Sequence, residues 1–159
     1  MPDITRVLVI DDHPLFRRGV CQLLGLEPGY TVVGEAAGGQ EGIARARELD
    51  PDLILLDLNM KGMNGLETLR TMRDHEIDAR IIILTVSNAP EDLIAAIRAG
   101  SDGYILKDND PADMLSLIGN VMKGQNAISL FDFPTARHFR MAVSRSVRLA
   151  ALRLSTTLS

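Results

Sequence analysis

The chain has 159 residues, the size of one domain or of one domain with a short appendage. It is 46% hydrophobic and 24% charged, which is ordinary for a soluble globular protein. No apolar run approaches the ~20 residues of a membrane span, and the N-terminus lacks the apolar core of a secretion signal. Cys21 is the single cysteine, which excludes an internal disulfide, and its helical pattern predicts a small buried side chain. We therefore expect a cytoplasmic protein.

The net charge of −4 is unevenly distributed along the chain. Residues 1–130 hold 12 Lys and Arg against 20 Asp and Glu, whereas residues 131–159 hold five Arg and only one acid, Asp132. Such a shift indicates two segments of different character. We expect a domain over residues 1–124, followed by a linker and basic tail over residues 125–159.

Short apolar runs alternate with helical patterns through the first 124 residues. In chain order the sequence predicts strand 6–10, helix 14–26, strand 31–36, helix 38–50, strand 52–57, helix 64–74, strand 80–86, helix 90–99, strand 102–107 and helix 108–124. Pro14 and Pro111 suit first helical turns, Asp110 suits a cap, and Gly124 ends the last helix. Five such units with nearly continuous apolar strands predict a parallel α/β sheet covered by helices on both faces.

Polar side chains stand where the predicted strands end. Asp11 and Asp12 follow the first strand, Asp57 ends the third, Thr85 lies at the end of the fourth, and Lys107 ends the fifth. In a parallel α/β sheet the functional loops lie at the carboxyl ends of the strands. These five side chains are therefore expected to meet at one edge of the sheet.

The chemistry of this set is specific. Clustered carboxylates repel one another unless a cation is present, and Mg²⁺ prefers such oxygen ligands. A carboxylate can attack phosphorus to form an acyl phosphate, and Asp57, at mid-sheet, is the expected nucleophile. Lys107 and Thr85 could contact the transferred phosphoryl oxygens. Backbone amides in the loop of Gly62 and Gly65 could stabilise the same charge.

Residues 5–124 resemble the receiver domains of two-component response regulators. The resemblance rests on "VIDDHPLFRRG", "DLILLDLNMKGMNGLETL", "IIILTVSN" and "GSDGYILKD", in order and with the expected spacing. It implies a flavodoxin-like, CheY-like, doubly wound sheet of five parallel strands in the order 2-1-3-4-5 with five helices. "DDHPLFRRG", "LLDLNM" and "GYILKD" are most similar to the NarL/FixJ subfamily, especially its nitrate/nitrite-responsive members.

The resemblance also implies roles. Asp57 would accept a phosphoryl group from a sensor histidine kinase, and Asp11, Asp12, Asp57 and the backbone carbonyl of Asn59 would hold Mg²⁺. The protein would hydrolyse only its own phosphate and would not be a turnover enzyme. Its output would be transcriptional, with DNA binding only if a helix-turn-helix domain exists in the full-length protein.

A second set of residues would read out the phosphate. Thr85 would be the switch hydroxyl, and Tyr104 the aromatic partner that changes rotamer. Asn59, Ser87 and Lys61 would tune the lifetime of the phosphate. A homodimer could form through helix 90–99, strand 102–107 and helix 108–124, or through the first and last helices.

Two positions depart from the family pattern. Lys61 stands where proline is usual, which loosens a turn and adds a charge. Asp108 follows Lys107 where many receivers have a cis proline, so the isomer of this peptide bond is left open. His13 is interpreted as a surface residue at a helix start rather than a metal ligand, since no second His or Cys lies near it in sequence.

The tail after "GQNAISL" departs from the family altogether. A complete helix-turn-helix domain does not fit into 29 residues. Three interpretations stay open: a remnant of a truncated or frameshifted gene, an amphipathic helix that packs on the receiver or on a second copy, or a basic arm for nucleic acid or an anionic membrane. The amphipathic pattern places apolar residues at 139, 143, 147, 150 and 154.

Two other functions compete with the phosphoacceptor. Asp57-Leu58-Asn59 is similar to the Asp-x-Asp nucleophile motif of haloacid-dehalogenase-like phosphatases, although Asn59 cannot serve as the acid/base. A phosphorylation-independent interaction module is the other alternative. It agrees less well with the presence of all five expected side chains.

Overall fold

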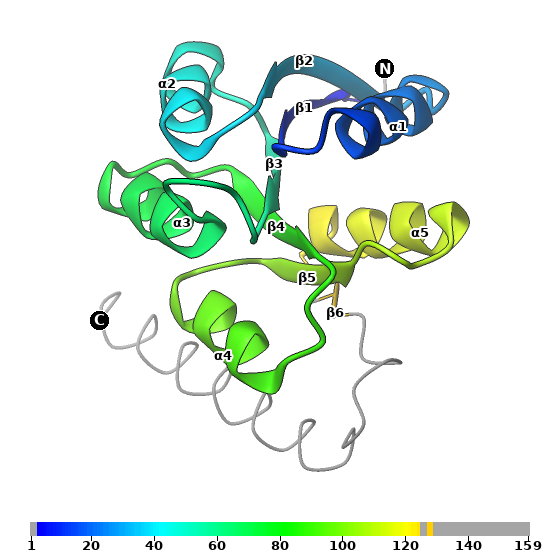
Figure 1. Cartoon of the computed structure of the whole chain (residues 1–159). Coiled ribbons are helices and arrows are strands. Elements are labelled where there is room, and N and C mark those ends of the chain that lie inside the picture. Colours follow the sequence, from blue (N-terminus) through cyan, green and yellow to red (C-terminus); the bar gives the residue numbers. More distant parts are fainter. Residues whose placement is uncertain (1–2, 125–126, 129–159) are drawn as a thin grey trace, which may run out of the picture.

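The computed structural model describes residues 3–124 and 127–128. Strands and helices alternate along the chain (Figure 1): β1 Thr5–Ile10, α1 Pro14–Gly25, β2 Tyr30–Ala36, α2 Gly39–Leu49, β3 Leu53–Asp57, α3 Gly65–Asp74, β4 Arg80–Thr85, α4 Pro90–Arg98, β5 Gly103–Leu106, α5 Pro111–Met122 and β6 Ala127–Ile128. The interpretations of the tail at residues 131–159 fall outside the described residues.

All strand pairs are parallel, and the strand order is β2-β1-β3-β4-β5-β6. The predicted order 2-1-3-4-5 is therefore confirmed. The two-residue strand β6, which pairs Gly103 with Ala127 and Tyr104 with Ile128, was not predicted. A strand of two residues is too short to produce a recognisable alternation in sequence.

The helices form two layers around the sheet. Figure 1 shows α1 and α5 on one face and α2, α3 and α4 on the other. Alternate residues of β1 serve the two layers, because Val7 and Val9 belong to the apolar cluster beneath α1 and α5 while Leu8 and Ile10 belong to the opposite cluster. Every residue of β3 is buried, as expected for a central parallel strand.

Local signals in the sequence explain where the helices begin. The Asn64 side chain accepts a hydrogen bond from the Glu67 amide at 2.9 Å, and the Asp110 side chain accepts one from the Ala112 amide at 3.1 Å. These contacts satisfy amide donors that a helix start leaves unpaired. They fix the start of α3 at the end of the loop that follows Asp57 and the start of α5 at the end of the loop that follows Lys107.

Cys21 lies on α1 and is half-buried rather than buried as predicted. Burial raises the pKa of its thiol to about 11, and the charge of Glu35 acts in the same direction. The thiol is therefore protonated at neutral pH and packs as a small apolar side chain.

Within the described ranges, no helix combines the length and apolarity that crossing a bilayer requires.

Candidate functional site

The carboxyl ends of β1, β3, β4 and β5 bring the five predicted side chains together. Asp11, Asp57 and Thr85 are almost fully buried, at 1%, 2% and 0% exposure. The side chains of Asp12 and Lys107 keep 20% and 9% exposure. The site is thus a largely buried group of charges that reaches solvent mainly at Asp12.

The ammonium group of Lys107 lies between two carboxylates. Its Nζ atom is 2.7 Å from Asp11 Oδ2 and 3.3 Å from Asp57 Oδ1. The ring of Phe16 lies 4.4 Å from the same nitrogen and holds it by a cation–π contact. Lys107 is therefore anchored with its charge directed at Asp57, although Asp11 is its nearer partner.

Within the described part of the chain, only one of the two carboxylate oxygens of Asp57 accepts a hydrogen bond. The backbone N–H of Asn59 donates to Asp57 Oδ1 at 3.2 Å, whereas Asp57 Oδ2 accepts no hydrogen bond from the described residues. Burial raises the pKa of Asp57 from 3.8 to about 6. The neighbouring charge of Asp11 also raises it, while Lys107 and the Asn59 amide lower it. The ionised form of Asp57 is therefore disfavoured unless a further cation is present.

The acidic residues form a group that fits a divalent cation. One ligand atom from each of Asp11, Asp12, His13 and Asp57 lies within 4.8 Å of the others. Asp12 Oδ1 and Asp57 Oδ2 are buried and accept no hydrogen bond among the described groups. Buried carboxylate oxygens that accept no hydrogen bond are suitable ligands for Mg²⁺, a hard cation that prefers oxygen. The backbone carbonyl of Asn59 stays a predicted ligand.

The Thr85 hydroxyl connects the site to β5. Thr85 Oγ1 accepts a hydrogen bond from the Ser87 amide at 3.0 Å and one from the Asn59 side-chain amide at 3.4 Å. Tyr104 is fully buried, and its hydroxyl donates to the Ser87 carbonyl at 3.0 Å. Burial raises the pKa of Tyr104 to about 12, so this donor keeps its proton. Residues 85, 87 and 104 therefore form one hydrogen-bonded unit beside Asp57.

Lys61 contributes its backbone rather than its side chain. The Lys61 N–H donates to Asp12 Oδ2 at 3.1 Å, and the side chain is exposed. A proline at this position could not make the bond, because proline has no amide hydrogen. The sequence singled out Lys61 for its charge, and the hydrogen bond to Asp12 was missed because it depends on how the loop after β3 folds back.

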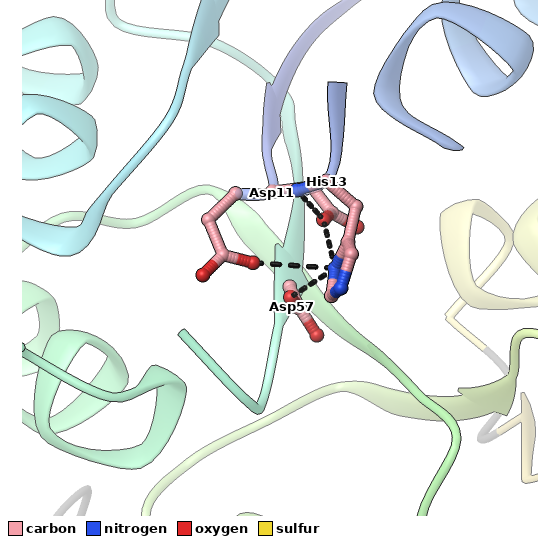
Figure 2. A group of neighbouring side chains, drawn as sticks. Asp11, His13 and Asp57 are labelled. Carbon is pink, nitrogen blue, oxygen red and sulfur yellow. Dashed lines mark hydrogen bonds and ion pairs between the residues drawn. The ribbon is translucent and has the colours of Figure 1, made fainter. Parts of the chain in front are cut away.

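His13 is the N-cap residue of α1, and its side chain is 67% exposed, as predicted for a surface residue. Its Nδ1 atom nevertheless faces the carboxylates, at 3.4 Å from Asp11, 3.2 Å from Asp12 and 3.8 Å from Asp57 (Figure 2). The sequence missed this contact, although the adjacency of His13 to the acidic pair was a usable signal.

The Lys107–Asp108 peptide bond, left open above, is trans.

Comparison with known proteins identifies the family. The model of the response regulator receiver domain family matches residues 7–119, well over half of the chain. The chain belongs to this family. Its fold, strand order and site position are those of a two-component receiver.

Two curated relatives come from Escherichia coli K12. The nitrate/nitrite response regulator protein NarL is 51% identical over 123 residues, which cover 77% of this chain and 57% of NarL. The nitrate/nitrite response regulator protein NarP is 54% identical over 131 residues, which cover 81% of this chain and 61% of NarP. The subfamily expected from the sequence is confirmed. The chain spans about three fifths of the length of these relatives.

Solved structures give the same result. The receiver domain of the putative response regulator NarL from Mycobacterium tuberculosis is 34% identical with a TM-score of 0.74, and the match covers 78% of this chain and 100% of that one. The response regulator domain of Thermotoga maritima CheB is 28% identical with a TM-score of 0.70, covering 76% and 97%. The CheY-like fold is therefore common to this chain and to both structures.

Proposed function

We propose that Asp57 is the phosphoacceptor of this receiver and that a sensor histidine kinase is the donor. One observation carries the proposal: Asp57 Oδ1 lies at the end of β3 within 3.3 Å of Lys107 Nζ and 3.2 Å of the Asn59 amide. Both groups are hydrogen-bond donors that can also contact the negatively charged oxygens of a phosphoryl group on Asp57. Burial of the carboxylate strengthens each of these interactions.

In the transfer step, a carboxylate oxygen of Asp57 attacks the phosphorus of a phosphohistidine. The new O–P bond forms as the P–N bond breaks, and the imidazole of the kinase leaves with the electron pair. Lys107 pairs with a phosphoryl oxygen and keeps Asp57 oriented. Asp11, Asp12, Asp57 and the Asn59 carbonyl would hold Mg²⁺, which would neutralise charge on the transferring group.

The phosphorylated state would be read through Thr85 and Tyr104. A phosphoryl group adds acceptor oxygens close to the Thr85 hydroxyl, which would exchange its present contacts for that group. Tyr104 already lies buried, so we propose that phosphorylation stabilises this inward rotamer. Ser87 would follow Thr85, and Asn59, Ser87 and Lys61 would set how fast water removes the phosphate.

The remaining assignments are proposals for the whole protein. We assign residues 1–124 to the receiver and residues 125–159 to a linker and basic tail. The kinase partner places the protein in the cytoplasm, and the output is transcriptional control. Dimers would form through α4, β5 and α5 or through α1 and α5, and DNA would be a partner only through a helix-turn-helix domain of the full-length protein.

Phosphorylation by a small donor tests the role of Asp57. Wild-type protein incubated with acetyl phosphate and Mg²⁺ is expected to gain the mass of one phosphoryl group, and Asp57→Asn none. The matched control is Asp74→Asn, which makes the same chemical change at an exposed residue near the end of α3. Equal labelling of wild type and Asp57→Asn would show that another residue accepts the phosphate.

A measurement of catalytic turnover distinguishes a receiver from the alternative, a phosphatase. That chemistry needs an acid/base two residues after the nucleophile, and this position is Asn59, whose side-chain amide donates to Thr85. We expect no sustained hydrolysis of a small phosphate ester, only slow loss of the phosphate from Asp57. Multiple turnovers that disappear in Asp57→Asn would favour the phosphatase.

The Lys61 amide has a separable effect on the metal site. We expect Lys61→Pro to weaken Mg²⁺ binding about fivefold, since Asp12 loses a hydrogen bond of ~1 kcal/mol. Lys61→Ala removes the charge but keeps the N–H, so its affinity should stay within about twofold of wild type on the same reasoning. Isothermal titration with Mg²⁺ measures both. Equal weakening in the two variants would contradict the role of the amide, because only Lys61→Pro removes the N–H that donates to Asp12.

A further inference from the structure

The His13 imidazole lies beside the carboxylate side chains of the site. It follows Asp11 and Asp12 directly and is the N-cap residue of α1, where its side chain makes no capping hydrogen bond. Figure 2 shows the ring directed toward Asp57 and Asp11. The backbone of His13 is tied in place as well, because its N–H donates to Asp11 Oδ1 at 2.8 Å. The backbone that carries the ring is thus fixed by local structure.

The nearest atoms of the ring match the spacing of metal ligands. Neighbouring ligands in an octahedral complex with bonds of 2.0–2.2 Å are about 3 Å apart, and opposite ligands are about 4.3 Å apart. His13 Nδ1 lies 3.2 Å from Asp12 Oδ1 and 3.8 Å from Asp57 Oδ2. All four candidate ligand atoms fall within 4.8 Å of one another. One ion can therefore reach all four after small side-chain adjustments.

An unpartnered atom at the centre points independently to a ligand. Asp57 is 2% exposed, and its Oδ2 atom accepts no hydrogen bond from any described group. The imidazole does not satisfy it, since 3.8 Å is too long for a hydrogen bond. A buried carboxylate oxygen without a partner carries a desolvation cost that a bound cation removes. The free oxygen and the ring nitrogen face the same space.

We propose that His13 is a fourth side-chain ligand, beside Asp11, Asp12 and Asp57, and that it extends the metal range of the site from Mg²⁺ to transition metals such as Ni²⁺. The inference rests on the proposed cation site beside Asp57. Carboxylate oxygens alone favour hard ions, whereas an imidazole nitrogen adds affinity for the borderline metals of the first transition row. The same carboxylates would hold either ion, so Ni²⁺ and Mg²⁺ would compete.

Metal titrations of three proteins test the selectivity. Isothermal titration with Ni²⁺ and with Mg²⁺ is made on wild type, His13→Asn and His75→Asn. His75 follows α3 and is exposed, so it is the matched control for loss of a surface histidine. For His13→Asn we expect Ni²⁺ affinity to fall by about tenfold or more and Mg²⁺ affinity by less than about threefold. His75→Asn should leave both unchanged.

Direct detection of the nitrogen completes the test. Mn²⁺ bound to wild type should show ¹⁴N modulation in pulsed electron paramagnetic resonance, and His13→Asn should lose it. No ¹⁴N modulation in wild type, or unchanged Ni²⁺ affinity in His13→Asn, would overturn the ligand role and leave the ring as an ion-pair partner of Asp12. Absence of Mg²⁺ binding in wild type would instead count against the cation site of the proposed function. The two failures are therefore distinguishable.

Discussion

Asp57→Asn is expected to raise the free energy of unfolding of the metal-free protein at pH 7.5. The wild-type carboxylate is buried beside Asp11, and Lys107 is shared between the two acids. Asparagine keeps the shape and removes one negative charge, and Lys107 keeps its 2.7 Å contact with Asp11. A pKa raised from 3.8 to about 6 corresponds to a gain on the order of 2–3 kcal/mol.

The same shift fixes the direction of the pH dependence. Between pH 4 and pH 6 the folded protein binds more protons at Asp57 than the unfolded chain does, because the pKa of the group is raised on folding. The contribution of Asp57 to the free energy of unfolding therefore falls as the pH rises through this window and is constant above about pH 7. Asp57→Asn should lack this slope.

Urea unfolding in EDTA from pH 5 to pH 7.5 measures both effects. Far-UV circular dichroism is the suitable probe because the chain has no tryptophan. The difference between Asp57→Asn and wild type should grow with pH, while Asp74→Asn should follow wild type throughout. A less stable Asp57→Asn protein at pH 7.5 would contradict the idea that the buried charge of Asp57 opposes folding.

Gly65→Ala is expected to destabilise the protein by about 3 kcal/mol. A Cβ atom at Gly65 would lie 2.6 Å from the Cα atom of Leu58 and would collide with the carbonyl oxygen of Asp57. Both obstacles are backbone, so no side-chain rotation relieves them. The Gly65 amide also closes the loop by donating to the Leu58 carbonyl at 2.9 Å. The close approach of α3 to the end of β3 thus requires glycine.

Gly119→Ala is the matched control for the same substitution. A Cβ atom at Gly119, inside α5, meets nothing within 4 Å. Alanine there should raise stability by about 0.5–1 kcal/mol, because it reduces the entropy of the unfolded chain and favours the helix. Urea unfolding should therefore move in opposite directions for the two variants. A loss in Gly65→Ala no larger than a few tenths of a kcal/mol would show that the loop yields easily.

Much of the site was predictable because its residues are tied to strand ends. An apolar run of four to six residues marks a buried strand, and the next polar residue must then stand at its carboxyl end. This reasoning placed Asp11, Asp57, Thr85 and Lys107 at one edge, and the structure brings them together. The start of α5 followed in the same way from the predicted cap at Asp110.

The contacts across the loops were not predictable in this way. Lys107 lies closer to Asp11 than to Asp57, the Lys61 amide donates to Asp12, and the ring of His13 faces the carboxylates. Each of these depends on the direction of a side chain or an amide in a segment without a periodic pattern. Sheet register and loop closure fix such directions, and residues distant in sequence determine both.

The sequence by itself determined the order of the elements and the identity of the charged groups, because hydrophobic period and helix caps are local properties of the chain. The family followed from the resemblance of its motifs to those of known receivers. Only the tertiary structure decided how these charges are paired. It leaves Asp57 Oδ2 without a hydrogen bond and sets His13 Nδ1 opposite it at 3.8 Å. The physical reason is that pairing energies inside a buried site depend on distances of a few ångströms, which only the packed sheet and its loops define.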